Sequence, residues 1–549
     1  MRPLRRALST ALLSLVAGSV ASAQSPRTWT PGSNDPGSAI ETAPVLQLQE
    51  AGIGQPIADP VSRITSSTPV RPASVFSQTL TAEDIEAIVD MRLAEKEAEA
   101  AKKEEEKKSI APGAASDKPD LSMTGKWNNG LEWATKDKDF KVHVGGRYQM
   151  DNSWFSADQS VQNNINIPYA DGIDFRRARF RIEGTMYKYI DWTAECDFVN
   201  SFRANASSGP GFTENSTVAL TDFWWQCREV PFFGTVRVGQ QKEAIGFEHL
   251  VSSRFLPFME RSYNQDAFYG GLYNGFTPGV AAFRNYGDQR GVIHYGLYKP
   301  VNNVFGYNTG DGDYSVVGRV THLLGYADEG RRLIHVGVSG KQATAVSQAG
   351  IPGRSISFRT RDAIRAGFSQ DWPVPAGITL FGDDIQQVNT ELVAVNGRWT
   401  FQSEYMVSAM QDARLAVGDP LGNNVVYHGG YLQLLCFLTD DHDHYNKQTG
   451  VLERLSPSNN FSMKNPCGRF LGGGAWQVGA RYNYIDLNDI GLNGGALYNQ
   501  TYGLNWFLNP NMKCQLNYIQ TYRDVSDTTR FPGGSGWVEG FGGRIACDF

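Results

Sequence analysis

Apolar and polar residues alternate along much of this chain, most clearly in its last nine residues, FGGRIACDF (541–549). In an extended strand, Arg544 and Asp548 share one face, and the opposite face carries the small and apolar residues Phe541, Gly543, Ile545, Cys547 and Phe549. Such a strand suits a sheet with water on one side and lipid on the other. A sheet that spans a bilayer must close so that every backbone group is paired. The pattern therefore predicts an outer-membrane β-barrel.

The same two-residue period recurs through residues 139–549, which we expect to form one antiparallel barrel domain. In FRRARFRIEG (175–184), Arg177, Arg179 and Arg181 oppose apolar neighbours. Long and short gaps between strands alternate, as in barrels with long outer loops and short periplasmic turns. An irregular segment at 440–474 interrupts this order and leaves the strand count open. Further strands are expected at 141–151, 192–198, 235–241, 315–323, 333–339, 398–407, 431–438, 476–484 and 502–507.

The N-terminus has the features of a cleaved secretory signal. Residues 1–23 combine a basic start, an apolar stretch at 7–20 and the small-residue sequence Ala21-Ser22-Ala23. The apolar stretch is too short for a spanning helix, and no later segment approaches the roughly 20 apolar residues that one needs. We therefore expect export to the outer membrane of a bacterium with a Gram-negative type of envelope.

A linker and a charged helix are expected between the signal and the barrel. Residues 24–80 are rich in Ser, Thr and Pro without apolar periodicity, which predicts disorder. Residues 81–109 predict a helix whose apolar stripe is Ile85, Val89 and Leu93. That helix either forms a parallel coiled coil that supports a homotrimer or is a solvated spacer. Residues 110–138 are expected to be a second linker.

Composition and motifs exclude several classes of function. The net charge of −6 gives no support to nucleic-acid binding. No nucleophile elbow, zinc-protease motif or phosphate-binding Gly-Lys loop occurs, so we predict neither an enzyme nor a cofactor. The 58 glycines and 12% aromatic residues suit the turns and girdles of a barrel, although a secreted β-sandwich has a similar composition.

Cysteines and acidic loops give weak signals. There are 6 cysteines without a C-x-x-C pair; Cys514 and Cys547 either bridge the last two strands or serve as small apolar residues on the lipid face. The clusters at 440–444 (DDHDH) and 311–313 (DGD) lack the full ligand series of calcium or zinc sites. We predict no metal site.

Basic residues on the polar strand faces are the candidate functional residues. Arg177, Arg179 and Arg181 lie about 6 to 7 Å apart along one strand face, given a rise of about 3.3 Å per residue. Such a ladder attracts anions, unless Glu183, Glu195, Asp197 and Glu404 pair with it as a purely structural network. The candidate anion-binding residues are Arg147, Arg177, Arg179, Arg181, Arg237, Lys242, Arg254, Arg261, Arg319, Arg398, Arg481 and Arg544.

The segment GQQKEAIGFEHLVSSRFLPFMERS (239–262) is too long and too aromatic for a turn. It carries Lys242, Arg254 and Arg261 together with three glutamates. Folded into the lumen, it would narrow the pore and place these cations where passing ions shed water. The alternative is an ordinary external loop.

Several long segments, in this order, resemble the phosphate-selective porin O and P family over the region after residue 124. The chain departs from the family's usual GQFKEP at Gln241 and Ala244. The resemblance implies a homotrimer of 16-stranded barrels, with 18 strands as our alternative, each with its own anion pore. It is carried by FRRARFRIEG, VRVGQQKEAIGFE, SSRFLPFMERS, RVTHL, RWTFQSEYM, GGYLQLLCFLT, GGGAWQVGARYNYIDLND and YGLNWFLNPNMKCQLNYI.

The predicted function is passive diffusion of anions through an outer-membrane pore lined by arginine and lysine. The resemblance implies inorganic phosphate or polyphosphate, or other small anions, as the solutes, with outer-membrane lipid around the barrel. The competing hypothesis is a structural or adhesive barrel with a plugged or non-selective lumen.

Overall fold

The computed structural model consists of two units, residues 1–114 and 115–549, each of which is considered by itself. In the first unit, residues 91–92 and 94–98 are helical, and positions 85, 89 and 93 of the predicted stripe lie outside the described residues. The structure describes residues 91–92, 94–98, 120–162, 169–199, 218–269, 275–300, 314–344, 346–348, 351–365, 376–416, 419, 422–462, 473–525 and 534–549, and the short strands β6 (Arg203–Ala204) and β7 (Phe212–Thr213).

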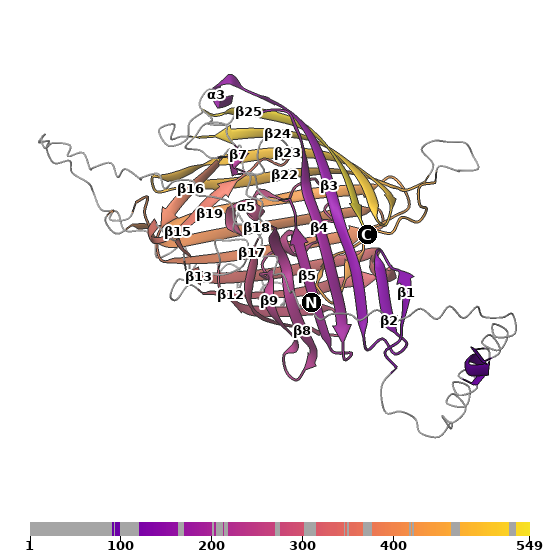
Figure 1. Cartoon of the computed structure of the whole chain (residues 1–549). Helices are drawn as coiled ribbons and strands as arrows, with labels where there is room; N and C mark the ends of the chain where they lie inside the picture. The colour runs from indigo at the N-terminus through magenta and orange to yellow at the C-terminus, as the bar shows by residue number, and fades with distance from the viewer. Residues whose placement is uncertain are drawn as a thin grey trace, which may run out of the picture. The chain divides into compact units, whose positions relative to one another are not determined.

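The second unit contains a closed antiparallel barrel of 16 strands, which confirms the predicted fold class (Figure 1). Consecutive barrel strands pair with each other around the wall. The strands are β3 (Lys141–Ala157), β4 (Gly172–Met186), β5 (Ile190–Asp197), β8 (Ala219–Val230), β9 (Gly234–Lys242), β10 (Phe276–Tyr286), β11 (Gly291–Tyr298), β12 (Ser315–Ala327), β13 (Arg332–Thr344), β17 (Asp384–Asn396), β18 (Trp399–Ala413), β19 (Asn423–Phe437), β22 (Ala475–Asp489), β23 (Leu492–Asn509), β24 (Met512–Asp524) and β25 (Gly536–Asp548).

The barrel closes between its last strand and its first. β25 pairs with β3 from Val538↔Ala157 to Asp548↔Arg147. The backbone of Phe549 continues the ladder, since its N–H donates to the Gly146 carbonyl at 3.0 Å. A Cβ atom at Gly145 would lie 2.3 Å from the Phe549 carbonyl oxygen, so the seam requires a residue without a side chain there.

The alternation of the sequence becomes the two faces of the wall. In β12, Val316, Val320 and Leu324 are exposed on the outside, whereas Arg319 and Thr321 are buried on the inside. Aromatic pairs stack across strands on the outer face, for example Trp476 and Trp506 with ring centroids 5.0 Å apart. An outer apolar face and an inner polar face are what lipid outside and water inside require. Within the described residues, no helix has the length and apolar character needed to cross a bilayer.

A β-hairpin stands where a linker was predicted. β1 (Met123–Trp127) pairs with β2 (Leu131–Thr135), and β2 pairs with the start of β3 from Leu131↔Val144 to Ala134↔Lys141. The linker prediction for 110–138 is therefore wrong over residues 123–135. The hairpin pairs with residues 141–144 of β3, beyond Arg147, where the pairing of β3 with β25 ends. Its two strands have five residues each, too few for an alternating pattern to be recognised in the sequence.

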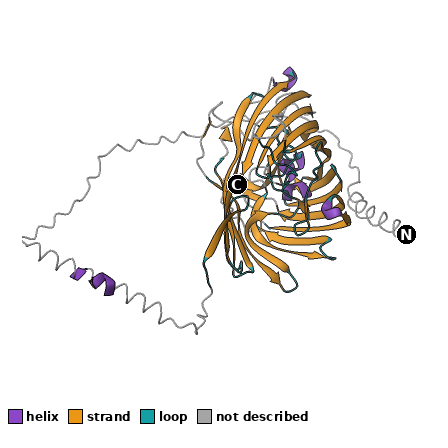
Figure 2. Ribbon diagram, turned by 90° about the vertical axis from the view of Figure 1, so that its right-hand side faces the viewer, coloured by secondary structure: helices purple, strands orange, loops and turns teal. Residues whose placement is uncertain are grey.

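Three segments between barrel strands fold inward, and Figure 2 shows helices and loops within the curve of the strands. The first, which we call the constriction loop, follows β9 and contains α4 (Phe247–Leu250) and α5 (Tyr263–Phe268). The second contains β14 (Val346–Gln348), β15 (Ile351–Thr360) and β16 (Ala376–Phe381), and its residues 361–365 are buried against α5. The third, the inner segment, links β19 to β22 and contains β20 (Tyr445–Asn446) and β21 (Val451–Leu452).

The inner segment explains the break in the predicted rhythm. It leaves the barrel at the end where short turns join β4 to β5, β8 to β9 and β17 to β18. Instead of turning back, it enters the lumen, where the carbonyls of Thr449 and Gly450 accept hydrogen bonds from Arg319 at 3.3 and 3.0 Å. The long segment thus adds no strand to the wall, and the count stays at 16.

The five cysteines within the described residues are free. Met512 pairs with Cys547 and Cys514 pairs with Ile545, so the two cysteines are offset by one pair along the lipid face. The bridge considered between Cys514 and Cys547 is therefore wrong, and both serve as small residues.

Candidate anion site in the lumen

A cavity of about 460 Å³ lies between the barrel wall, the constriction loop and the inner segment. The basic side chains outnumber the acidic ones that line it, Glu183, Asp222 and Glu453. The structure gathers eight of the twelve candidates here, together with Arg454. The nine basic side chains are Arg147, Arg177, Arg179, Arg181, Arg237, Lys242, Arg254, Arg261 and Arg454.

The register of β3, β4 and β5 builds the basic wall. Arg147 pairs with Arg179, and Gln149 with Arg177, across β3 and β4. Neighbouring residues in adjacent strands are about 5 Å apart, so the guanidinium groups crowd one face of the lumen. Arg179 and Arg181 in turn lie opposite Asp197 and Glu195 of β5. The fold therefore places acids beside Arg179 and Arg181, the part of the ladder nearer the short-turn end.

Part of the ladder is compensated by these acids. Glu195 accepts hydrogen bonds from Arg147 at 2.9 Å and from Arg179 at 3.0 Å, and it is fully buried. Asp197 accepts from Arg179 at 2.6 Å, and Glu183 accepts from Arg181 at 2.7 Å. The structural network considered for these arginines is thus present around Arg147, Arg179 and Arg181.

Four cavity cations have neutral hydrogen-bond partners instead. Arg177 donates to the Gln149 amide oxygen at 2.6 Å, and Arg237 donates to that of Gln226 at 2.7 and 2.9 Å. Lys242 and Arg261 both donate to backbone carbonyls within the constriction loop, those of His249 and Val251 for Lys242 and those of Glu248 and Val251 for Arg261. Within the described residues, these four side chains are satisfied as donors and none of them forms an ion pair.

The constriction loop uses its own acids as anchors to the wall, which leaves its cations toward the cavity. Each acid of the loop forms an ion pair with a base outside the loop. The pairs are Glu243 with Lys341, Glu248 with Arg481, Glu260 with Arg176 and Arg544, and Asp266 with Arg361 and Arg365. The prediction that this segment folds inward is in line with these contacts, which an external loop could not make.

The Glu260 anchor persists at acidic pH. Burial alone would raise the pKa of Glu260, but Arg176 and Arg365 outweigh it and hold the pKa well below the ordinary 4.5. A carboxyl group with a lowered folded-state pKa contributes its stability above the unfolded value and loses it only as the pH falls through the folded value. The Glu260 carboxylate should therefore remain ionised and paired throughout the range above about pH 4.5.

Glu404 of β18 also anchors the constriction loop. Its carboxylate accepts from the backbone N–H groups of Phe247 and Glu248 at 2.5 and 2.9 Å, at the start of α4. The hydroxyl of Tyr431 donates to the same carboxylate at 2.6 Å. Glu404 was expected to balance lumen arginines; its contacts make it instead an anchor of the constriction loop.

Four of the twelve candidates lie outside the cavity lining. Arg319 is paired with Glu391 at 2.7 Å, Arg481 with Glu248, and Arg544 with Asp151 at 2.6 Å, all buried. Arg398, which parity assigned to a strand, is exposed in the turn between β17 and β18, because β18 begins at Trp399. The pore-lining prediction is therefore corrected for these four residues.

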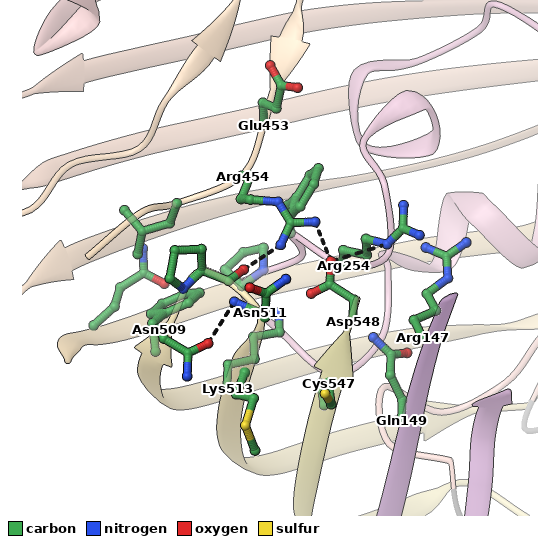
Figure 3. A pocket seen from close by; sticks show the side chains of 18 of the residues that line it. Arg147, Gln149, Arg254, Glu453, Arg454, Asn509, Asn511, Lys513, Cys547 and Asp548 are labelled. Atoms are coloured by element: carbon green, nitrogen blue, oxygen red, sulfur yellow. Dashed lines mark hydrogen bonds and ion pairs between the residues drawn. The ribbon is translucent and has the colours of Figure 1, made fainter. Parts of the chain in front are cut away.

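Two basic residues escaped the sequence pattern. At Arg176 a bulge breaks the register, since Gln149 pairs with Arg177 but Met150 pairs with Phe175. Arg176 and Arg177 consequently both point inward and are buried. Arg454 belongs to the inner segment, whose sequence shows no alternating pattern. Arg454 forms an ion pair with Asp548, and Arg254 lies beside the same carboxylate (Figure 3).

The acidic cluster at 440–444 has a structural role at its second residue. Asp441 accepts hydrogen bonds from Thr439 at 2.6 Å and from the Ser458 N–H and hydroxyl at 2.7 and 2.9 Å. Across the part of the chain that the structure describes, no three His, Cys, Asp or Glu side chains form a metal-binding group. The cluster at 311–313 lies outside the described residues.

Comparison with known proteins agrees with this architecture. A family model described as phosphate-selective porin O and P matches residues 142–532. Porin O of Pseudomonas aeruginosa is 24% identical over 460 residues, covering 75% of this chain and 90% of that protein. An uncharacterised protein of Caulobacter vibrioides is 26% identical over 411 residues, covering 71% of this chain and 70% of that protein.

Solved structures are similar at a greater distance. An anion-selective porin from Comamonas acidovorans aligns with a TM-score of 0.42 and 11% identity, covering 75% of this chain and 100% of that one. The family model, in contrast, spans more than half of the sequence. The chain therefore belongs to the phosphate-selective porin O and P family and is an outer-membrane porin.

Proposed function

We propose that this porin conducts small anions, with inorganic phosphate or polyphosphate as its principal solutes. The observation that carries the proposal is the imbalance of charge in the cavity, where nine basic side chains face three acidic ones. Arg177, Arg237, Lys242 and Arg261 support it further, because their described partners are neutral. A pore whose positive charges are uncompensated concentrates anions and repels cations.

The mechanism is passive. An anion entering the cavity exchanges part of its hydration shell for guanidinium and ammonium donors, and it moves between several weak sites. Several sites serve conduction better than one tight site, because an ion must also leave. Among small anions, phosphate is expected to bind these groups best, because the planar guanidinium group of arginine can donate to two phosphate oxygens at once. No step requires a cofactor or a chemical reaction.

A plugged barrel is the competing function, and the cavities argue against it. A second cavity of about 280 Å³ lies next to the first and shares Arg181, Glu183, Arg254, Glu453 and Arg454 with it. The second cavity reaches the hairpin residues Asn128 and Asn129, at the end of the barrel that carries the short turns. Two adjacent polar cavities that share lining residues and extend toward that end suit a conduit rather than a plug.

We infer the following setting for the pore. Short turns face the periplasm in outer-membrane barrels, so anions would leave the lumen at the end with the hairpin. Outer-membrane lipid would surround the exposed apolar face. A homotrimer, supported by the helix at 81–109, is the expected assembly, with one pore in each subunit.

Phosphate selectivity is tested by chloride current through single channels in a planar bilayer. Addition of millimolar inorganic phosphate should reduce the chloride current, because phosphate competes for the same guanidinium groups and dwells longer on them. Sulfate at equal ionic strength is the control for a general effect of divalent anions. An anion-selective channel whose chloride current ignores phosphate would restrict the function to a general anion porin.

A further inference from the structure

Two arginines from different inward segments converge on one carboxylate near the end of the chain. Asp548, the last residue of β25, accepts from Arg454 of the inner segment through Oδ2, and Arg254 of the constriction loop lies with its Nε 3.5 Å from the same oxygen (Figure 3). Arg454 also donates to the Pro510 carbonyl. One oxygen of a phosphate ion would meet the same two guanidinium groups.

The cluster stands at the neck of the route through the lumen. Arg254 and Arg454 line both the cavity of about 460 Å³ and the cavity of about 280 Å³. Their side chains are 16% and 18% exposed and that of Asp548 is 13% exposed, so water and ions reach all three. Because both cavities share these two arginines, an ion that passes from one cavity to the other comes within their reach.

The electrostatic environment changes at the neck. We call the cavity of about 460 Å³ the upper cavity and the cavity of about 280 Å³, at the short-turn end, the lower cavity. The upper cavity is lined by nine basic and three acidic side chains, whereas the lower cavity is lined by four of each and by His143. The acids of the lower cavity are Glu132, Glu183, Glu453 and Asp548. An anion that moves from the upper cavity toward Asp548 therefore leaves a region of net positive charge for one in which basic and acidic side chains balance, which favours its release.

The contacts of Arg254 make it available to a second partner. Among the residues that the structure describes, the ion pair with Asp548 is the one polar partner within reach of its guanidinium group. At 3.5 Å this contact is longer than the charge-assisted hydrogen bonds of the ladder. An incoming oxyanion can replace it without breaking another interaction.

We propose that Arg254 and Arg454 form an oxyanion-binding site at the periplasmic neck, which Asp548 occupies between ions and from which it displaces the bound anion. The proposal rests on the function proposed above and adds a release step to it. Asp548 acts as a built-in competitor, which keeps the site weak enough for fast exit.

The test measures the current carried by inorganic phosphate as a function of its concentration, using the full-length protein in planar bilayers. Asp548→Asn removes the competitor, so the half-saturating phosphate concentration should fall about tenfold, which corresponds to about 1.4 kcal/mol, and the maximal current should fall with it. Arg454→Gln removes one ligand and should raise the half-saturating concentration. Arg332→Gln, an exposed arginine paired with Asp328 at the short-turn end, is the matched control and should behave as the unmodified pore.

Asp548 lies in the closing strand, and its replacement could prevent assembly. In that case Arg454→Gln decides alone, because its segment contributes no strand to the wall. A half-saturating concentration equal to that of the unmodified pore would overturn the site, in either variant that inserts. A cation-selective unmodified pore would instead overturn the proposed function, which separates the two failures.

Discussion

At the scale of single residues, the partner of each arginine matters more than its direction. Arg319 and Arg544 face the lumen as the period predicts, yet each is bound by a carboxylate, 72 residues away in Glu391 and 393 residues away in Asp151. Arg177 and Arg237 face the same space with amide partners. The first pair holds the wall and its contents together, and the second pair supplies charge to the cavity.

Replacing Arg177 or Arg237 by Gln should weaken anion selectivity. A unit charge acts on an ion about 4 Å away by about 1 kcal/mol in bulk water, so each change should lower anion permeability about fivefold, and it should lower the anion-to-cation permeability ratio by more because cations are no longer repelled. The loss should be clearest near 0.1 M salt and small at 1 M, where the screening length is about 3 Å. Zero-current potentials check this, with Arg332→Gln as control; an unchanged ratio in both variants would contradict the role given to neutral-partnered arginines.

The sequence predicted the directions but could not predict these partners. Period two assigns a residue to a face of a regular strand, which is why Arg147, Arg177, Arg179, Arg181 and Arg237 line the cavity; the other three candidates that line it were predicted from the unusual segment at 239–262. It fails at the bulge of Arg176, at the strand boundary of Arg398 and in the inner segment of Arg454. Ion pairs across hundreds of residues depend on barrel closure, which no local pattern contains.

At the scale of elements, the inward segments decide what the barrel can pass. The wall of 16 strands follows from alternation, but the constriction loop and the inner segment bound the cavity and supply three of its eight arginines, Arg254, Arg261 and Arg454. The acids of the constriction loop pair with bases of the wall and of the second inward segment, while its cations line the cavity, so the same ion pairs that dock the loop leave its positive charge to the pore. Loops of this kind have no period, so the sequence showed that they are unusual without showing where they lie.

Glu404→Gln should loosen the constriction loop without changing the wall. The amide keeps one acceptor for the N–H groups of Phe247 and Glu248 and loses the charge, at a cost of about 1.5 to 3 kcal/mol. Single-channel recordings should then show larger and noisier conductance with reduced selectivity. Gln402→Glu, on the same strand and face, would test whether position rather than charge matters. A quiet channel of normal conductance in Glu404→Gln would mean that the other acids suffice as anchors.

At the scale of the whole molecule, the barrel sequence follows an N-terminal region that lacks the alternating pattern of membrane-spanning strands. The barrel buries its backbone in a closed sheet and needs no partner for that purpose. The helix expected at residues 81–109 could not bury its predicted apolar stripe alone, which is the reason to expect association with other copies.

Deleting residues 81–108 should weaken the trimer while leaving each barrel intact. Native gel electrophoresis in mild detergent should show trimers that dissociate at lower temperature than those of the full chain. Heat-modifiable migration of the monomer provides the control for barrel folding. Trimers of equal thermal stability would assign residues 81–109 to a spacer, with contacts between barrels carrying the assembly.

The measurement that tests the central claim most directly is the zero-current potential of the unmodified pore in a gradient of potassium chloride, near 0.1 M on the dilute side. Nine basic and three acidic side chains around the main cavity predict that chloride permeates faster than potassium, so the potential takes the sign that the chloride gradient sets. A potential of the opposite sign, set by potassium, would contradict the account, because the acids of the lumen would then outweigh its arginines.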